Sequence, residues 1–295
     1  METLKKLIVS SDSLWGILVH VVLLLRFLPG INRIFQSLLY FKCLLEREKI
    51  QTFVRSLHDS HQVKSGPFEG LCYPGLESAG SMLSPKLLGS YETEIAGYFS
   101  PVYLEQFTDF VDVGCAEGYY AVGCLRLSST LNVVCFDTDK EARQLCLGMA
   151  EANGVDDRIE VRSACRESDL LQLGGKRALI VCDCEGFEME LFSNQVVDSL
   201  ASSDAIIEVH EQKGANLETL RRRFEATHSI EVVFSKTDLE KVLEYEVPDL
   251  KGRSISESVL YVAECRPVRM MWLIAQSKSS RRVSSGVDAN SSADQ

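Results

Sequence analysis

Short apolar runs alternate with stretches of helical spacing through the second half of the chain. Seven such runs lie at Phe110–Val113, Val133–Phe136, Ile159–Val161, Ala178–Cys182, Ala205–Val209, Ile230–Phe234 and Met270–Ala275. Between most of them lie segments that read as helices, such as residues 142–152. Strands that alternate with helices indicate βαβ units and a largely parallel sheet covered on both faces. We therefore predict an α/β fold for this part of the chain.

The longest apolar run is close to the N-terminus, at Leu14–Leu25, and only His20 interrupts it. It is shorter than the roughly 20 residues that span a bilayer, and Arg26 follows it. Three arrangements of this predicted helix stay open: packing on this protein or a partner, lying in a membrane interface, and spanning a membrane. Its length favours the first. No small-residue cleavage site follows, so we do not expect a cleaved signal peptide.

Four segments are predicted along the chain. Residues 1–62 form a helical extension, in which a second helix follows Pro29-Gly30 over 31–57. Residues 63–107 are a linker rich in Gly, Pro and Ser with a lead-in helix that Ser84-Pro85 would start. The α/β domain covers 108–276, and the Ser-rich tail 277–295 is expected to be disordered.

Composition and charge exclude some classes of protein and argue against one class of partner. Hydrophobic residues make up 45% and charged residues 25% of the chain, which excludes a disordered protein and a multi-span membrane protein. The net charge of −11 argues against nucleic acid as a partner. Residues 1–60 are nevertheless basic, with eight Lys/Arg and five Asp/Glu. We expect weak, salt-sensitive membrane association through Lys5, Lys6, Arg33 and the Leu14–Leu28 helix.

The ten cysteines are too sparse for a disulfide scaffold. Six of them lie in apolar or strand-like runs, where a free thiol acts as a small hydrophobe: Cys115, Cys124, Cys135, Cys146, Cys165 and Cys182. Cys182 and Cys184 have no second pair at zinc-finger spacing, so we do not predict a structural zinc site. Reduced thiols indicate a cytoplasmic protein, with or without membrane association.

A glycine-rich turn follows the first predicted strand. Gly114 and Gly118 are spaced as G-x-x-x-G, which is neither the dinucleotide-binding G-x-G-x-x-G nor a phosphate-binding P-loop. Asp112 precedes the turn, and Asp137 ends the second strand, where an acid can accept hydrogen bonds from a ribose diol. Two acids beside a turn without phosphate features favour a nucleoside ligand with a positive group, and S-adenosylmethionine fits. A generic turn with solvated acids is the alternative.

Together these motifs resemble the FkbM-like family of class I S-adenosylmethionine-dependent methyltransferases over about 109–276. The turn Asn153-Gly154-Val155 also matches, and residues 183–188, Asp-Cys-Glu-Gly-Phe-Glu, are similar to the family's D-V-E-G-x-E signature. The resemblance implies a Rossmann-like, seven-stranded, mostly parallel sheet with helices on both faces. It also implies a cofactor site at Asp112, Gly114, Glu117, Gly118, Asp137 and Asp183.

Two positions depart from the family pattern. Glu117 stands where an Asn is common, and it would either bind the cofactor's ammonium group or cap the following helix. Asp137 stands where the family has a Glu, so the shorter side chain would need a bridging water to reach the ribose.

Acids and a histidine gather at the ends of the fourth and fifth predicted strands. Asp183 and Glu185 are two residues apart, Glu188 follows, and Glu208 and His210 end the neighbouring strand. By resemblance and geometry, Asp183 contacts the cofactor's methionine end or the acceptor, and Glu185 or His210 is the general base. A divalent metal held by Asp183, Glu185 and His210 is a less favoured alternative. The other histidines, His20, His58, His61 and His228, read as surface or packing residues.

The predicted function is an S-adenosylmethionine-dependent methyltransferase that O-methylates a hydroxyl of a sugar, glycolipid or small metabolite. The alternative is a catalytically inactive methyltransferase-like binding module, tethered by its N-terminal helices. A nicotinamide-dependent oxidoreductase is disfavoured because the G-x-G-x-x-G turn is missing. The loops at 71–89 and 212–216 contain no motif that identifies the methyl acceptor. No sequence pattern indicates an oligomeric state.

Overall fold

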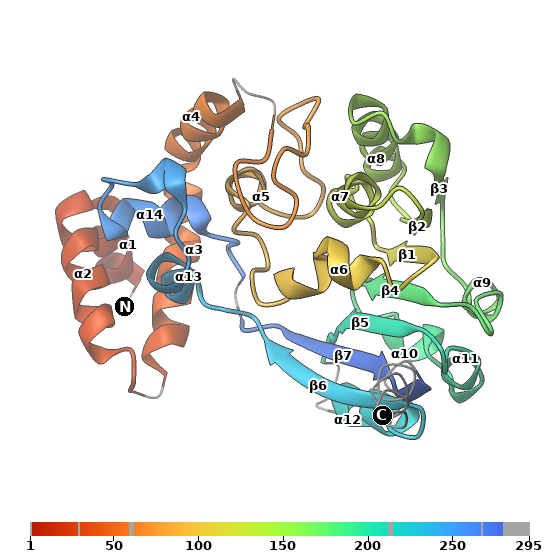
Figure 1. Ribbon diagram of the computed structural model, residues 1–295. Helices are drawn as coiled ribbons and strands as arrows, with labels where there is room; N and C mark the ends of the chain where they lie inside the picture. Colours follow the sequence, from red (N-terminus) through yellow and green to blue (C-terminus); the bar gives the residue numbers. More distant parts are fainter. Residues whose placement is uncertain (1, 29, 59–61, 212–214, 267, 280–295) are drawn as a thin grey trace, which may run out of the picture. The chain divides into compact units, whose positions relative to one another are not determined.

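The computed structural model describes residues 2–28, 30–58, 62–211, 215–266 and 268–279 (Figure 1). The chain forms two compact units. The first unit combines residues 1–97 with residues 235–269, and the second combines residues 98–234 with the residues from 270 onward. This grouping differs from the linear division that the sequence predicts, in which 235–269 belong to the α/β domain. Most of the tail predicted to be disordered, residues 280–295, lies outside the described residues.

One seven-stranded sheet forms the second unit, with the strand order β3-β2-β1-β4-β5-β7-β6. Neighbouring strands from β3 through β5 are parallel, whereas β7 is antiparallel to β5 and β6. The predicted sheet is therefore confirmed. Each strand lies within two residues of its predicted run: β1 (Asp109–Val113), β2 (Asn132–Phe136), β3 (Ile159–Arg162), β4 (Ala178–Cys182), β5 (Asp204–Glu208), β6 (His228–Phe234) and β7 (Met271–Ser277).

The centre of the sheet explains why its strands are continuous apolar runs. Every residue of β4 and β5 is buried, as expected where helices cover both faces. In β1, Val111 and Val113 join a core that includes Phe224, while Asp112 points to the opposite face. The strand order reverses between β1 and β4, and ligands of such sheets bind in the crevice at that switch point.

Helices pack on each face of this sheet. On the Asp112 face, α7 contacts β1 and β2, and α8 contacts β3. On the other face, residues of α9, α11 and α12 complete the core around β4. The helices of this unit are α6 (Pro101–Leu104), α7 (Tyr119–Leu127), α8 (Lys140–Ala152), α9 (Glu167–Leu171), α10 (Glu188–Leu191), α11 (Asn194–Ser199) and α12 (Asn216–Phe224), with a 3-10 turn, η2 (Asp156–Arg158). A further 3-10 turn, η1 (Ala96–Phe99), leads into the unit.

The first unit is helical, and two predictions about it are wrong in detail. The single helix expected over 31–57 is broken at Glu46 into α3 and α4. Ser84 does not cap its helix, because α5 begins earlier and the Ser84 hydroxyl donates to the carbonyl of Tyr261 at 2.6 Å. The elements are α1 (Glu2–Ser10), α2 (Asp12–Leu25), α3 (Ile31–Leu45), α4 (Arg47–His58), α5 (Leu83–Leu88), α13 (Asp238–Glu244), η3 (Pro248–Leu250) and α14 (Ile255–Val262).

Buried charges tie residues 235–269 to the N-terminal part of this unit. The Lys241 ammonium contacts the Glu264 carboxylate, and both side chains are almost fully buried. The same carboxylate accepts a hydrogen bond from the Glu92 backbone N–H at 2.8 Å and pairs with Arg266 at 2.9 Å. Separating these groups would leave charges buried without partners, which is costly. This network explains why a segment expected in the α/β domain packs elsewhere.

The helices of the first unit are also short. The longest apolar one, α2, has 14 residues. Over the described ranges, every helix is too short or too polar to cross a bilayer.

Candidate functional site

The glycine turn after β1 presses its backbone against the end of β4. Gly114 has a φ of +85°, and a Cβ built there would lie 1.7 Å from the Asp183 carbonyl oxygen. Its N–H donates to the carbonyl of Phe136 at 2.8 Å, so the turn also contacts the end of β2. Gly118 has a φ of +91° and begins α7. The turn therefore brings the carboxyl ends of three strands together, and only glycine fits at Gly114.

Asp137 holds this turn in place. Its Oδ2 accepts a hydrogen bond from the Ala116 backbone N–H at 2.9 Å, and its Oδ1 accepts one from the Asp139 N–H at 2.8 Å. Ala116 has a φ of +48°, which an alanine rarely adopts without such support. A carboxylate oxygen has two lone-pair sites, so Asp137 can still accept a hydrogen bond from a ligand. The sequence predicts only the ligand contact and not this role in fixing the turn.

The other two predicted acids of the turn are buried. Asp112 is 2% exposed, and its Oδ2 has no hydrogen-bond partner among the described residues. Burial raises the pKa of the Asp112 carboxyl well above its ordinary value of 3.8, which favours the neutral form. Glu117 is also buried and directly precedes Gly118, the N-cap of α7, where the helix dipole favours a carboxylate.

Three thiols cluster beneath the turn. The sulfur atoms of Cys115, Cys135 and Cys146 lie within 4.8 Å of one another, and all three side chains are buried. A Cβ at Gly118 would lie 2.9 Å from the Cys146 sulfur, so the cluster directly supports the turn. The sequence predicts that each thiol is a small buried hydrophobic group, and this is confirmed. It does not predict that the three thiols lie next to one another. They come from the turn, from β2 and from α8, and no spacing along the chain links those positions.

The second cluster surrounds His210, directly after β5. The imidazole Nδ1–H donates to Glu188 Oε1 at 2.7 Å, and Nε2 lies 3.4 Å from Glu185 Oε2 and 3.7 Å from Asp183 Oδ1. Glu188 is 1% exposed and also accepts a hydrogen bond from the Gly186 N–H at 3.0 Å. The structure thus brings three predicted acids onto one histidine.

The acids around His210 favour the protonated form of its imidazole ring. Its hydrogen bond to Glu188 raises the pKa of His210 from its ordinary value of 6.5 to about 9. The charges of Glu188, Asp183 and Glu208 act in the same direction, whereas burial opposes them. An imidazolium cannot accept a proton, so near neutral pH the geometry favours Glu185 over His210 as a base. The Glu185 side chain is 89% exposed and can meet a ligand from solvent.

The same atoms offer a cation site. One ligand atom each from Asp183, Glu185 and His210 lie within 4.8 Å of one another, and carboxylates suit hard divalent ions. A metal would need the neutral imidazole, whereas the surrounding carboxylates favour the protonated ring. A bound ion and the imidazolium are therefore alternative ways to balance these acids.

The structure describes the side chains of two of the other histidines, His20 and His228. His20 is exposed, with its Nδ1 2.7 Å from the Gly16 carbonyl oxygen. His228 is buried, with its Nε2 2.9 Å from the Ser203 carbonyl oxygen. These are the surface and packing roles expected of them. His61 and the side chain of His58 lie outside the described residues.

We compared the chain with protein families, curated proteins and solved structures. No family model and no curated protein match the chain. A putative O-methyltransferase from Klebsiella pneumoniae is 12% identical, with a TM-score of 0.40, over 77% of this chain and 89% of its own. The StiE O-MT structure is 14% identical, with a TM-score of 0.41, over 65% of this chain and 75% of its own. Likeness at this level carries no argument about activity.

Replacing Gly114 tests the close contact between the turn and β4. Gly114→Ala places a methyl group where the Asp183 carbonyl lies and forces a positive φ on alanine, so we expect a loss of at least about 2 kcal/mol in unfolding free energy. Gly148→Ala is the matched control, because Gly148 lies in α8 with nothing within 4 Å of a Cβ. It should be neutral or stabilise by up to about 1 kcal/mol. Urea unfolding measures both, and equal effects would contradict the contact.

The coupling of His210 to Glu188 is measurable by NMR titration. Glu188→Gln removes the negative charge, so the pKa of His210 should fall from about 9 towards 6.5, while the exposed Glu190→Gln leaves it unchanged. Because folding raises this pKa, the stability that His210 contributes is fully present below pH 6.5 and is lost as the pH rises through 9. A His210 resonance that titrates near 6.5 in the wild type would refute the pairing.

Proposed function

We propose that this chain is an S-adenosylmethionine-dependent methyltransferase of the FkbM-like kind, which O-methylates a hydroxyl of a sugar, glycolipid or small metabolite. One observation carries the proposal. A glycine turn without phosphate-binding features is pressed onto the switch point of a parallel sheet, and acids flank it at the ends of β2 and β4. That arrangement suits a cationic nucleoside better than a dinucleotide.

The turn and its acids provide the contacts that such a cofactor requires. Bound S-adenosylmethionine supplies a methyl group on a positively charged sulfur. Gly114 lets the backbone approach the ligand without a side chain in the way, and the free lone pairs of Asp137 suit a ribose diol. Asp183, at the end of β4, is the acid that we assign to the ammonium group of the cofactor or to the acceptor. Asp112 is buried in β1 just before the turn, and its contact with the cofactor stays a prediction.

The acid and imidazolium cluster supplies the proton chemistry. A hydroxyl acceptor has to lose its proton as the new bond forms, which requires a base within hydrogen-bonding reach. Glu185 is exposed and lies next to His210, so we assign it this role. His210 keeps its own proton and orients Glu185 and Asp183 around it. Holding the acceptor and the methyl donor in line also lowers the barrier, since good orientation of reacting groups can supply about 7–11 kcal/mol.

Calorimetry tests the cofactor assignment. We expect wild-type protein to bind S-adenosylmethionine and not a nicotinamide dinucleotide. Asp183→Asn should weaken binding about ten-fold, because it removes a charge next to a cationic ligand. Asp157→Asn, an exposed acid far along the chain from the turn, should not change it. No heat from folded wild-type protein would overturn the proposal, and binding of the dinucleotide would favour an oxidoreductase instead.

The role of Glu185 is tested by the rate of S-adenosylhomocysteine release with a panel of sugars, glycolipids and small alcohols. Glu185→Gln should slow the reaction at least about 100-fold while cofactor affinity stays within about three-fold. Glu190→Gln, an exposed acid on α10, is the matched control and should react normally. If Glu185→Gln reacts like the wild type, the base lies elsewhere. If the wild type binds the cofactor and methylates nothing, while its biological activity survives Glu185→Gln, the binding-module alternative holds.

A further inference from the structure

The helix α2 has apolar side chains on both of its sides. Trp15, Val19 and Val22 face the interior of the first unit and are buried. The solvent side is also largely apolar beyond the first turn, with His20 as its polar residue, and it includes Ile17, which is 60% exposed, and Leu24, which is 80% exposed. A helix that is apolar on most of its circumference is normally enclosed by protein or by lipid. Nothing in the described part of the chain covers this side of α2.

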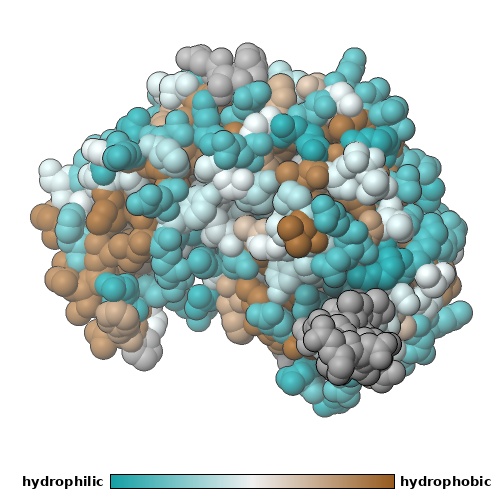
Figure 2. Space-filling view, in the orientation of Figure 1, coloured by the Kyte–Doolittle hydropathy of each residue, from teal (hydrophilic) through white to brown (hydrophobic). Residues whose placement is uncertain are grey.

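The exposed apolar side continues around the turn into α3. At the turn, Phe27 is 81% exposed and Leu28 is also exposed. Figure 2 shows brown side chains gathered over α2 and extending to this turn. We call the following set the apolar face: Leu14, Ile17, Val21, Leu24, Leu25, Phe27, Leu28, Ile34, Phe41, Leu44 and Leu45.

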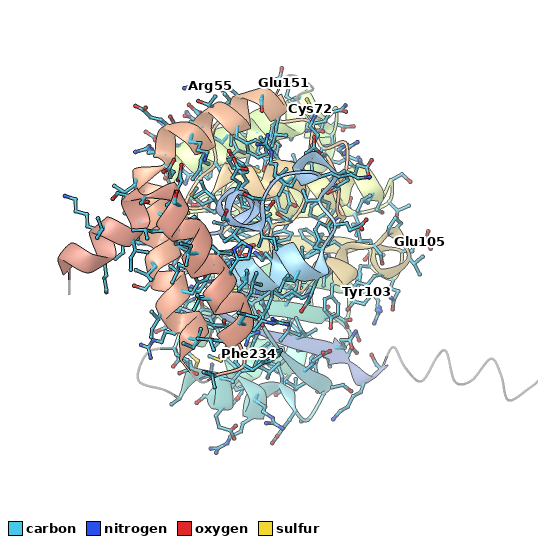
Figure 3. The ribbon with its side chains drawn as sticks, turned by 90° about the vertical axis from the view of Figure 1, so that its left-hand side faces the viewer. Arg55, Cys72, Tyr103, Glu105, Glu151 and Phe234 are labelled. Atoms are coloured by element: carbon cyan, nitrogen blue, oxygen red, sulfur yellow. The ribbon has the colours of Figure 1, made fainter. Side chains whose placement is uncertain are left out.

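This face is held rigidly by contacts on its inner side. The Trp15 ring stacks on Phe35 with ring centroids 5.5 Å apart, and its indole N–H donates to the carbonyl of Ser256 at 3.1 Å. The buried Lys42 ammonium of α3 pairs with Asp12 of α2 at 2.8 Å. Figure 3 views this bundle of α1–α4 from outside, with Arg55 labelled near the end of α4. Its exposed side chains can therefore be replaced without removing the contacts that fold it.

The charged residues near the apolar face indicate which kind of surface it binds. The chain as a whole is acidic, with a net charge of −11, yet residues 1–60 carry eight Lys/Arg against five Asp/Glu. Arg26 flanks the turn on one side and the exposed Arg33 on the other, and Lys6 is exposed on α1. An apolar surface bordered by cations is complementary to an anionic lipid bilayer. Two copies of this face would instead bring the same cations into one interface.

We propose that the apolar face binds the surface of anionic membranes, with α2 and the turn after it lying in the headgroup region. The helix lies in the interface and does not cross it, because its 14 residues reach only about 21 Å. Apolar burial supplies the attachment, and Arg26, Arg33 and Lys6 supply the preference for anionic lipid. The proposal does not depend on the methyltransferase assignment.

Vesicle sedimentation of the full-length protein tests this proposal. We expect the protein to bind phosphatidylcholine vesicles that contain phosphatidylglycerol, and to bind pure phosphatidylcholine more weakly. The triple variant Ile17→Ser, Leu24→Ser and Phe27→Ser should lose at least about ten-fold in the partition constant, because its apolar contacts are gone. Lys6→Gln with Arg33→Gln should lose only the preference for the anionic lipid and the sensitivity to salt.

A control variant replaces three exposed apolar residues outside the apolar face: Val102→Ser, Leu147→Ser and Leu243→Ser. This variant should bind vesicles like the wild type. Circular dichroism and the midpoint of thermal unfolding show that each variant is folded, and neither measurement depends on the proposed activity. If the Ile17, Leu24 and Phe27 variant still binds like the wild type, the proposal is wrong. If the wild type ignores vesicles and forms a dimer in sedimentation equilibrium that this variant abolishes, the face is a self-association surface.

Discussion

The contact between Gly114 and the end of β4 determines the arrangement of the candidate site. A side chain at this position would overlap the Asp183 carbonyl, so the turn after β1 can close onto β4 only with glycine. This contact places the glycine turn directly beside Asp183, the first residue of the acidic segment 183–188. Asp137 then fixes the turn from the side of β2 through two backbone hydrogen bonds. Two motifs that are about 70 residues apart in sequence thereby become one site.

The second half of that site is organised by a buried carboxylate. Glu188 accepts hydrogen bonds from both His210 and the Gly186 backbone, and it is excluded from solvent. It therefore sets the orientation and the charge of the imidazole, whose other nitrogen lies between Asp183 and Glu185. A positive ring at this position offsets the repulsion between the carboxylates that surround it. Glu188 is buried and Glu185 is exposed, so the two carboxylates that lie next to His210 differ in their access to solvent.

The first unit is governed by the same physical rule, that buried charges need partners. Lys241, Glu264 and Arg266 form a network with Glu92, and this network joins two segments that are far apart along the chain. Apolar groups follow the complementary rule. Trp15 and Phe35 are enclosed by the unit, whereas no described residue covers the opposite side of α2.

The sequence by itself determined the seven strands, the glycine turn and the identity of the acids, because strand patterning and turn chemistry are local properties. Only the tertiary structure decided how those acids are used. Asp112 and Glu188 look alike in sequence as acids near strand ends, and both are buried, yet Asp112 Oδ2 has no hydrogen-bond partner among the described residues whereas Glu188 binds His210. The break at Glu46 and the packing of residues 235–269 with the N-terminal helices were decided in the same way. Burial, and the partners that each buried charge finds, depend on which distant segments meet, and no periodicity along the chain encodes that.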